Sequence, residues 1–129
     1  MLRIEGIHHI AIICSDYPAS KKFYTEVLGF GVVRENYRKD RNSFKLDLSL
    51  GDRYVIELFS FPDSPQRPSW PEACGLRHLA FNVSDLEASI QYLNEKGVTT
   101  EPVRIDDYTS KRFTFFSDPD HLPLELYEK

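Results

Sequence analysis

The chain has 129 residues, with 16 Lys and Arg against 20 Asp and Glu and a formal net charge of −4. Its 41% hydrophobic and 28% charged residues are typical of a globular domain and exclude a disordered chain. The acidic balance argues against general nucleic-acid binding, and no apolar run approaches the roughly 20 residues that span a bilayer. Glu5 and Gly6 interrupt the place where a signal peptide would be apolar, so we expect a cytoplasmic protein. Cys14 and Cys74 lack the spacing of a metal knuckle or a disulfide framework, and we expect reduced thiols.

The first half of the chain is predicted to form a strand, a helix and three further strands. Residues 7–14 are an Ile-rich run typical of a strand. Ser15 and Asp16 provide a helix start, and Gly29 ends that helix. Strands are then predicted at 30–38, 43–50 and 53–61, and the pair Gly51-Asp52 indicates a hairpin between the last two.

The second half predicts the same order of elements. A strand at 76–83 is followed by a helix that Ser84 and Asp85 start and Gly97 ends, and then by strands at 98–104, 111–117 and 122–127. Four prolines within residues 62–71 exclude a helix there. We therefore expect an α+β fold of two βαβββ modules, 1–62 and 76–129, joined by a proline-rich connector at 63–75.

An internal repeat supports this division. Residues 9–20 align with residues 78–89 at an offset of 69, and six of the twelve positions are identical. Residues 55–59 align with 123–127 at an offset of 68. Two copies are too few for a solenoid, so we expect one domain with pseudo-two-fold symmetry.

The repeat singles out four residue positions with metal-ligand chemistry. Each module has a His in its first predicted strand and a Glu in its last: His9, Glu57, His78 and Glu125. A carboxylate among apolar strand neighbours is costly to bury unless it is paired or bound to a metal. Two imidazoles and two carboxylates suit a divalent Ni, Zn, Co, Mn or Fe ion. The alternative is that each His has ordinary hydrogen-bond partners and each Glu is a surface charge.

Two further histidines compete for a role. Strand alternation places His8 on the opposite face from His9, and the repeat aligns His9 with His78, so His8 is expected at the surface or at an interface. His121 lies in the predicted turn 118–121 and is expected to be a solvated loop residue.

Several stretches resemble the vicinal oxygen chelate superfamily, which includes glyoxalase I. They are residues 9–16, 23–30, 55–58, 78–83 and 118–126, and they cover nearly the whole chain. Within the superfamily the sequence is most similar to small bacterial stand-alone members. The resemblance implies that the two modules form an open, U-shaped sheet around one divalent metal held by His9, Glu57, His78 and Glu125.

The resemblance also implies a reaction. A His and a Glu in both modules resemble glyoxalase I, which suggests a metal-dependent lyase or isomerase acting on a small α-hydroxycarbonyl or hemithioacetal substrate. Glu57 or Glu125 would then be the general base, with no preference between them. The alternatives are an extradiol-type dioxygenase, which usually has two His and one Glu in a longer chain, and a non-catalytic small-molecule binding or resistance module. Fosfomycin-resistance transferases have a similar length but lack a ligand at the position of Glu57.

Substrate recognition and assembly are less defined by the sequence. Five basic residues are candidates for holding an anionic substrate, against the reading that they are exposed surface charges: Arg38, Lys45, Arg77, Lys111 and Arg112. Tyr54 and Tyr108 are candidates for lining the cleft, against the favoured alternative that they pack in the core or at the rim, and no residue set indicates a glutathione site. The family's Asp-Pro-Asp-Gly turn reads Asp-Pro-Asp-His at 118–121. A homodimer is expected, with modules paired within a chain or swapped between chains.

Overall fold

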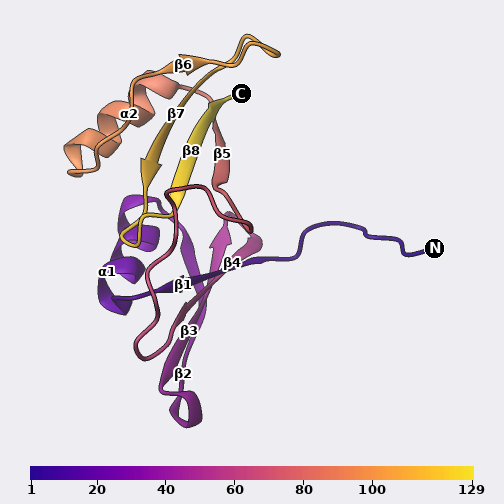
Figure 1. The fold of residues 1–129 in the computed structure, drawn as a ribbon, viewed down its shortest axis with the longest axis vertical. Coiled ribbons are helices and arrows are strands. Elements are labelled where there is room, and N and C mark those ends of the chain that lie inside the picture. The colour runs from indigo at the N-terminus through magenta and orange to yellow at the C-terminus, as the bar shows by residue number, and fades with distance from the viewer. The chain divides into compact units, whose positions relative to one another are not determined.

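The computed structural model describes residues 1–129, which form an N-terminal unit (Met1–Gln66) and a C-terminal unit (Arg67–Lys129). Each unit contains one four-stranded sheet and one α-helix (Figure 1). The predicted α+β class is therefore confirmed. The predicted connector 63–75 is shared between the units, and the assembly of the two modules into a single domain stays a prediction. None of the helices has the length and apolarity needed to cross a membrane.

The N-terminal unit has the element order that its sequence predicts. Its helices and strands are β1 (Ile10–Cys14), α1 (Tyr17–Lys22), a π-helical turn (Phe23–Val27), β2 (Gly31–Arg38), a 3-10 turn (Lys39–Arg41), β3 (Ser43–Leu50) and β4 (Arg53–Ser60). The strand order in the sheet is β1-β4-β3-β2. The first and last strands of the unit pair in parallel, whereas the other neighbours are antiparallel.

The C-terminal unit repeats this topology. Its elements are β5 (Leu79–Val83), α2 (Leu86–Glu95), β6 (Arg104–Ile105), β7 (Arg112–Ser117) and β8 (Pro123–Glu128). The strand order is β5-β8-β7-β6, and β5 again pairs in parallel with β8. The repeat seen in the sequence therefore corresponds to two units of the same βαβββ connectivity.

The N-terminal sheet has an apolar face and a more polar face. In the N-terminal unit Leu46, Leu48, Ile56 and Leu58 expose 1% of their surface or less. Because successive strand residues point to opposite faces, the residues between them, including Glu57, lie on the other face. The apolar face forms the core, and this leaves the opposite face free to carry a polar site.

The two α-helices begin where the sequence predicts. The carboxylate of Asp16 accepts a hydrogen bond from the Ala19 amide at 3.1 Å, and the carboxylate of Asp85 accepts one from the Ala88 amide at 2.9 Å. Both contacts satisfy amide groups that the first helical turn leaves without partners. The N-caps of both helices are therefore confirmed.

The helix that ends at Gly29 changes its geometry midway, which the sequence did not predict. The α-helical part stops at Lys22, and the next turn is π-helical. The Thr25 hydroxyl donates to the Lys21 carbonyl at 2.7 Å, and the Leu28 amide donates to the Phe23 carbonyl, five residues back. A threonine that bonds the carbonyl four residues back competes with the backbone ladder, which accounts for the wider turn.

The prediction of a strand at 98–104 is wrong, because β6 contains only two residues. The Glu101 amide does donate to the Phe115 carbonyl at 2.8 Å, but the Glu101 carbonyl accepts from the Thr114 side-chain hydroxyl at 2.7 Å, which is not a backbone ladder bond. The first strand of each unit also begins three residues later than predicted. His9 and His78 therefore lie one residue before β1 and β5 instead of inside them.

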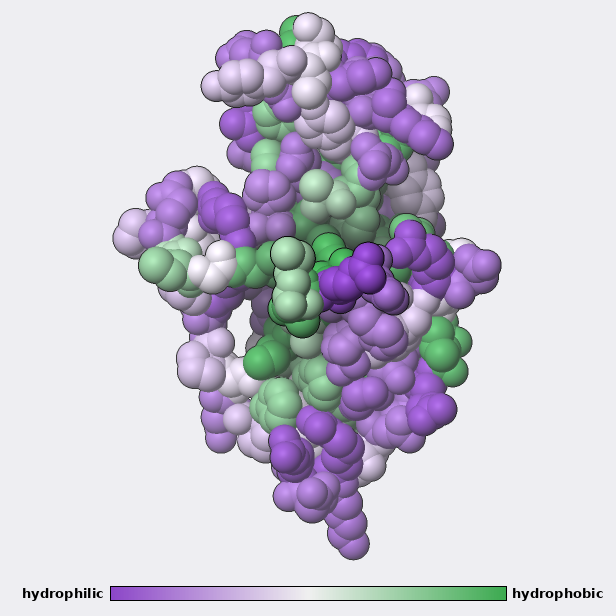
Figure 2. All heavy atoms as spheres, turned by 90° about the vertical axis from the view of Figure 1, so that its right-hand side faces the viewer, coloured by the Kyte–Doolittle hydropathy of each residue, from purple (hydrophilic) through white to green (hydrophobic).

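The segment before β1 is extended and exposes apolar side chains. It runs away from the sheet of its unit (Figure 1), and Met1, Leu2, Ile4 and Ile7 each expose more than three quarters of their surface. In Figure 2, where this segment points toward the viewer, hydrophobic atoms lie among hydrophilic ones. The parallel β1–β4 pairing starts only at Ile10, so the sheet does not hold the residues before His9.

The turn at 118–121 places His121 in a left-handed backbone conformation, with φ at 66°. The Asp118 carboxylate accepts bonds from the amides of Asp120 and Leu122, each at 2.9 Å, and these bonds hold the turn. A non-glycine residue is strained there, whereas glycine is not. We expect His121→Gly to raise the free energy of unfolding by about 0.5–1 kcal/mol, part of the gain being offset by the greater freedom of glycine in the unfolded chain. Urea denaturation measures this change, and an unchanged or lower midpoint would contradict it.

Candidate functional site

The N-terminal unit brings its predicted His and Glu into direct contact. The parallel register sets Ala11 of β1 beside Glu57 of β4, so the chain just before β1 passes the Glu57 side chain. The Nε2 atom of His9 lies 3.0 Å from Oε2 of Glu57. The exposed fraction of the side chain is 35% for His9 and 13% for Glu57. The carboxylate is thus mostly withdrawn from water, while the imidazole remains accessible.

Neighbouring polar groups hold this pair in place. The Tyr54 hydroxyl donates to Glu57 Oε2 at 2.5 Å and also lies 3.3 Å from Asp47, whose carboxylate pairs with Lys45 at 2.9 Å. Burial, together with the hydrogen bond to Glu57, raises the pKa of Tyr54 above its usual value, so its hydroxyl stays protonated and acts as a donor. On the other side, the Nδ1 atom of His8 lies 2.8 Å from Nδ1 of His9. His8 is exposed, as predicted, yet it contacts the ring that faces Glu57.

The C-terminal unit contains an equivalent pair in different surroundings. The Nε2 atom of His78 lies 3.0 Å from Oε2 of Glu125, with 35% and 11% of the side chains exposed. Phe115 is the register partner of Glu125, just as Asp47 is that of Glu57, and its ring meets the His78 ring edge-on at 5.0 Å. The residue aligned with Tyr54 in the repeat is Leu122, which has no hydroxyl. The His78–Glu125 pair therefore has an aromatic neighbour at the position where the His9–Glu57 pair has a polar one.

The donor set fits a divalent cation of the transition series. Each pair offers an imidazole nitrogen and a carboxylate oxygen close enough to share one ion, and this N/O chemistry suits Zn, Ni, Co, Mn or Fe. Within either unit alone, His, Cys, Asp and Glu form no group of three or more that could hold a metal. Cys14 and Cys74 are free thiols. The structure thus brings together His9 with Glu57 and His78 with Glu125, and the four-residue ligand set stays a prediction.

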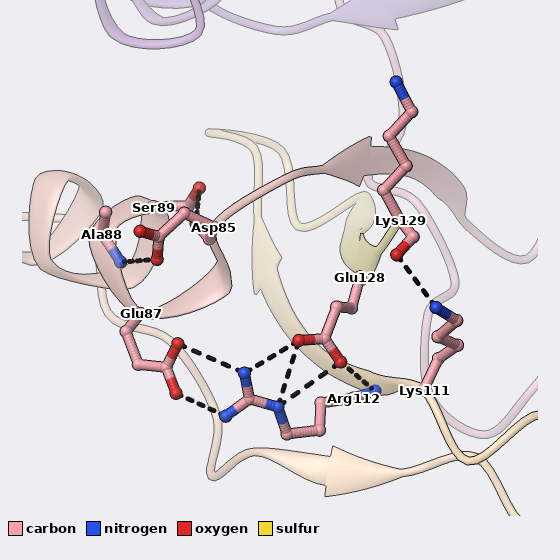
Figure 3. A network of polar contacts seen from close by, with 8 residues as sticks. All are labelled: Asp85, Glu87, Ala88, Ser89, Lys111, Arg112, Glu128 and Lys129. Carbon is pink, nitrogen blue, oxygen red and sulfur yellow. Dashed lines mark hydrogen bonds and ion pairs between the residues drawn. The ribbon is translucent and has the colours of Figure 1, made fainter.

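Most of the predicted substrate-binding cations have other partners. Arg112 lies between two carboxylates, with ion pairs to Glu87 and to Glu128 that link β7, α2 and β8 (Figure 3). The Lys111 ammonium donates to the Lys129 carbonyl, and the Arg77 guanidinium donates to the Ser69 carbonyl and lies over the Trp70 ring. Lys45 is bound to Asp47, and the side chain of Tyr108 is fully exposed in a turn. We therefore assign Arg112 and Lys45 to ion pairs within the fold and not to substrate binding. Among the five cations, Arg38 is the one whose side chain contacts neither a carboxylate nor a backbone carbonyl.

The Arg112 contacts should make stability depend on pH. Hydrogen bonds from Arg112 lower the pKa of Glu87 and of Glu128 below the ordinary value of 4.5. The unfolded chain then binds protons at a higher pH than the native one, so this stabilisation is present above pH 4.5 and is lost as the pH falls through the lowered native values. We expect Arg112→Met to lower the urea midpoint at neutral pH and to match the parent in acid. Arg41→Met, which removes an exposed arginine from the 3-10 turn, is the control, and equal losses in the two variants would contradict the assignment.

The Tyr54 hydrogen bond should support cation binding. Because the hydroxyl fixes the orientation of the Glu57 carboxylate, we expect Tyr54→Phe to weaken the affinity for Co²⁺ by about 10–100-fold, the usual cost of losing a residue that orients a ligand. A competition titration against a chromogenic chelator measures the affinity. Tyr108→Phe removes a hydroxyl from a fully exposed ring and is the matched control. Equal affinities of Tyr54→Phe and the parent would show that Glu57 needs no such support.

The sequence and the fold of this chain match those of a known protein family. Residues 6–126 match the model of the Glyoxalase/Bleomycin resistance protein/Dioxygenase superfamily. The chain is 64% identical to the uncharacterised protein YwkD of Bacillus subtilis, with 98% of each chain covered, and 59% identical to the uncharacterised protein YaeR of Escherichia coli over the full length of both. The crystal structure of a glyoxalase family protein from Enterococcus faecalis superimposes with a TM-score of 0.90 at 56% identity, covering 96% of this chain and 98% of that one. The resemblance to small bacterial members is therefore confirmed.

More distant relatives show the range of chemistry around this fold. They include a 2-epi-5-epi-valiolone epimerase of an Actinomyces species, which is 30% identical with 94% of this chain and 78% of that protein covered. The lactoylglutathione lyase of Schizosaccharomyces pombe is 27% identical, and this chain covers 46% of its length. The metallothiol transferase FosB of Staphylococcus saprophyticus is also 27% identical, with 77% of its length covered.

Proposed function

This chain belongs to the glyoxalase/bleomycin resistance/dioxygenase superfamily, and on that basis we propose that it is a divalent-metal-dependent lyase or isomerase of the glyoxalase I type. The observation that carries the proposal is the recurrence of one His–Glu contact, at 3.0 Å, in both units. We propose that His9, Glu57, His78 and Glu125 together hold one cation. The substrate would be a small α-hydroxycarbonyl compound or a hemithioacetal.

In the proposed reaction, the cation would activate the substrate and a carboxylate of the chain would move the proton. A bound divalent cation would supply Lewis-acid polarisation of the substrate carbonyl. The acidified C–H beside that carbonyl then gives its proton to a carboxylate of the chain, Glu57 or Glu125. With 13% and 11% of their side chains exposed, both carboxylates lie where little water competes for the proton. The same group would return that proton to the former carbonyl carbon while the hydroxyl proton passes to the former carbonyl oxygen, and these two transfers together complete an isomerisation.

Metal content and proton exchange test this proposal. The purified protein should contain about one divalent ion per chain by elemental analysis, as a single shared site requires. The loaded protein should isomerise the hemithioacetal of methylglyoxal and glutathione, or exchange the α-proton of a hydroxycarbonyl compound with solvent deuterium, and a chelator should abolish either reaction. Inactivity of the fully loaded protein in both assays would refute the lyase and isomerase assignment. Activity that requires Fe²⁺ and oxygen would support a dioxygenase instead, and tight ligand binding without turnover would support a binding module.

Members of this superfamily bind small molecules and often form dimers. We propose a homodimer located in the cytoplasm, since two-fold homo-oligomers are the commonest assemblies. Light scattering coupled to size-exclusion chromatography measures the mass in solution.

A further inference from the structure

Arg38, at the end of β2, has an unusual set of partners. Its Nη2 group donates to the Ser43 hydroxyl at 2.8 Å, and its Nε group is buried without any hydrogen-bond partner. No carboxylate of the chain pairs with this guanidinium. An arginine carries five N–H donors, and a partly buried cation with one hydrogen bond and no counter-ion is rare enough to need an explanation.

Two aromatic rings hold the guanidinium in a fixed place. Its central carbon lies 4.9 Å from the ring centroid of Phe59 and 5.5 Å from that of Phe61. The two rings are stacked on each other at 5.8 Å. Rings that pack against a guanidinium restrict its motion, so little conformational entropy remains to be lost when a ligand binds. Arg38 is therefore restrained by its neighbours while most of its N–H donors have no partner in the chain.

The place of Arg38 connects it to the His9–Glu57 pair. Phe59 and Glu57 alternate with buried Leu58 on β4 and so lie on one face of the sheet, about 7 Å apart along the strand. Lys45 is the register partner of Phe59, but its charge is neutralised by Asp47 at 2.9 Å, so Arg38 is the cation beside these rings that has no carboxylate partner. The guanidinium packs on Phe59, so it lies toward the same face of the sheet as the Glu57 carboxylate, and a small molecule with a reactive carbonyl at one end and an anionic group at the other would contact both from that face.

The C-terminal unit offers an internal comparison. There Arg104 lies over Phe113 and Phe115, at 5.1 and 5.3 Å, beside the second His–Glu pair. Arg104 does have an acidic neighbour, because its Nη2 atom lies 3.7 Å from Oε2 of Glu101. The Arg104 side chain is also exposed. An arginine over two phenylalanines thus occurs in both units, but only the N-terminal one lacks a carboxylate.

We infer that Arg38, supported by Phe59, Phe61 and Ser43, is the subsite for an anionic oxygen group of the substrate. This inference rests on the proposed function, which supplies the idea of a hydroxycarbonyl substrate. It narrows the class of substrates to hydroxycarbonyl compounds that carry a phosphate or a carboxylate. The planar guanidinium suits both groups, because each offers two oxygens to its paired N–H donors.

Anion binding to the metal-free protein tests the subsite separately from catalysis. Inorganic phosphate and acetate are titrated into chelator-treated protein while the Nε–H resonance of Arg38 and the amide resonances of Ser43 and Phe59 are followed by NMR. We expect at least one anion to shift these resonances in a saturable way. The anion with the lower dissociation constant identifies the preferred group. Arg38→Met should weaken this binding by about tenfold or more, the order expected for a charge-assisted hydrogen bond. Arg38→Lys, which keeps the charge but loses the planar fork, should bind less tightly than the parent, and Arg41→Met should bind as the parent does.

A second arm uses the metal-loaded protein. Solvent deuterium exchange is compared for dihydroxyacetone phosphate and for uncharged dihydroxyacetone, and the parent should prefer the phosphate by about tenfold or more in kcat/KM, a preference that Arg38→Met removes. Anion shifts that are absent from the parent, or that persist in Arg38→Met, would overturn the subsite. Phosphate binding at Arg38 without metal-dependent exchange of either compound would uphold the anion subsite and refute the proposed lyase or isomerase function.

Discussion

Replacing His78 with alanine is expected to lower the affinity for Co²⁺ by more than about 100-fold, because loss of a ligand costs more than the roughly 10–100-fold loss seen when only a supporting residue is removed. The substitution takes away the nitrogen that lies 3.0 Å from Glu125 and leaves that carboxylate without its histidine. His9→Ala should have a similar effect, since His9 stands in the same relation to Glu57. The affinity is measured by competition with a chromogenic chelator, and the absorbance of bound cobalt reports the coordination number.

The matched control for both variants is His121→Gly. It also removes one imidazole, but from an exposed turn, so the cobalt affinity should equal that of the parent. Comparable weakening in His9→Ala and His78→Ala would support one shared ion, because a cation bound by one pair alone would depend on only one of the two. A parent-like affinity of His78→Ala would refute the ligand assignment.

Replacing the two carboxylates in turn tests which of them is the proposed base. Glu57→Gln and Glu125→Gln keep the shape of the side chain but remove its charge and its ability to accept a proton. The variant that lacks the base should lose about 10²–10⁴-fold in kcat for proton exchange when assayed with the site fully loaded. We expect the larger loss in Glu125→Gln, because the Tyr54 hydroxyl restrains Glu57 whereas Leu122 cannot restrain Glu125.

The readout must exclude a simple loss of the cation. Both variants are assayed at saturating Co²⁺, and kcat is expressed per bound ion. A matched control is Glu95→Gln, at the end of α2, which should leave kcat unchanged. If both Glu57→Gln and Glu125→Gln retain the parent kcat, neither carboxylate is the base. A larger loss in Glu57→Gln would show that restraint by Tyr54 favours proton transfer.

The regular parts of the fold were predictable because their sequence patterns have one physical interpretation. β3 has the predicted limits, Ser43–Leu50, since apolar residues alternate with polar ones between clear turn signals. The π-helical turn was missed because apolar spacing is similar in α- and π-helical turns, and only the Thr25 side chain distinguishes them. β6 was overestimated because a β-branched run indicates a strand even where most residues of the run do not pair with a neighbouring strand.

Less of the candidate site than of the fold could be predicted from the sequence. Repetition identified His9, Glu57, His78 and Glu125, and the structure confirms the contact within each pair but leaves their common ligation as a proposal. The support from Tyr54 and Asp47 has no sequence signal, because polar strand residues beside a site resemble those facing solvent. Arg38 was one of five equivalent cations, and only the positions of the neighbouring carboxylates distinguish it from Arg112.

The parallel pairing of the first and last strand in each unit has a consequence for biosynthesis. His9 meets Glu57 only when β4 has joined β1, and His78 meets Glu125 only when β8 has joined β5. A growing polypeptide therefore has no His–Glu contact in either unit until the last strand of that unit is synthesised and paired. If the four residues share one cation, as we propose, binding of that ion requires both units to be folded, and a chain truncated before β8 would lack Glu125 and would not retain it.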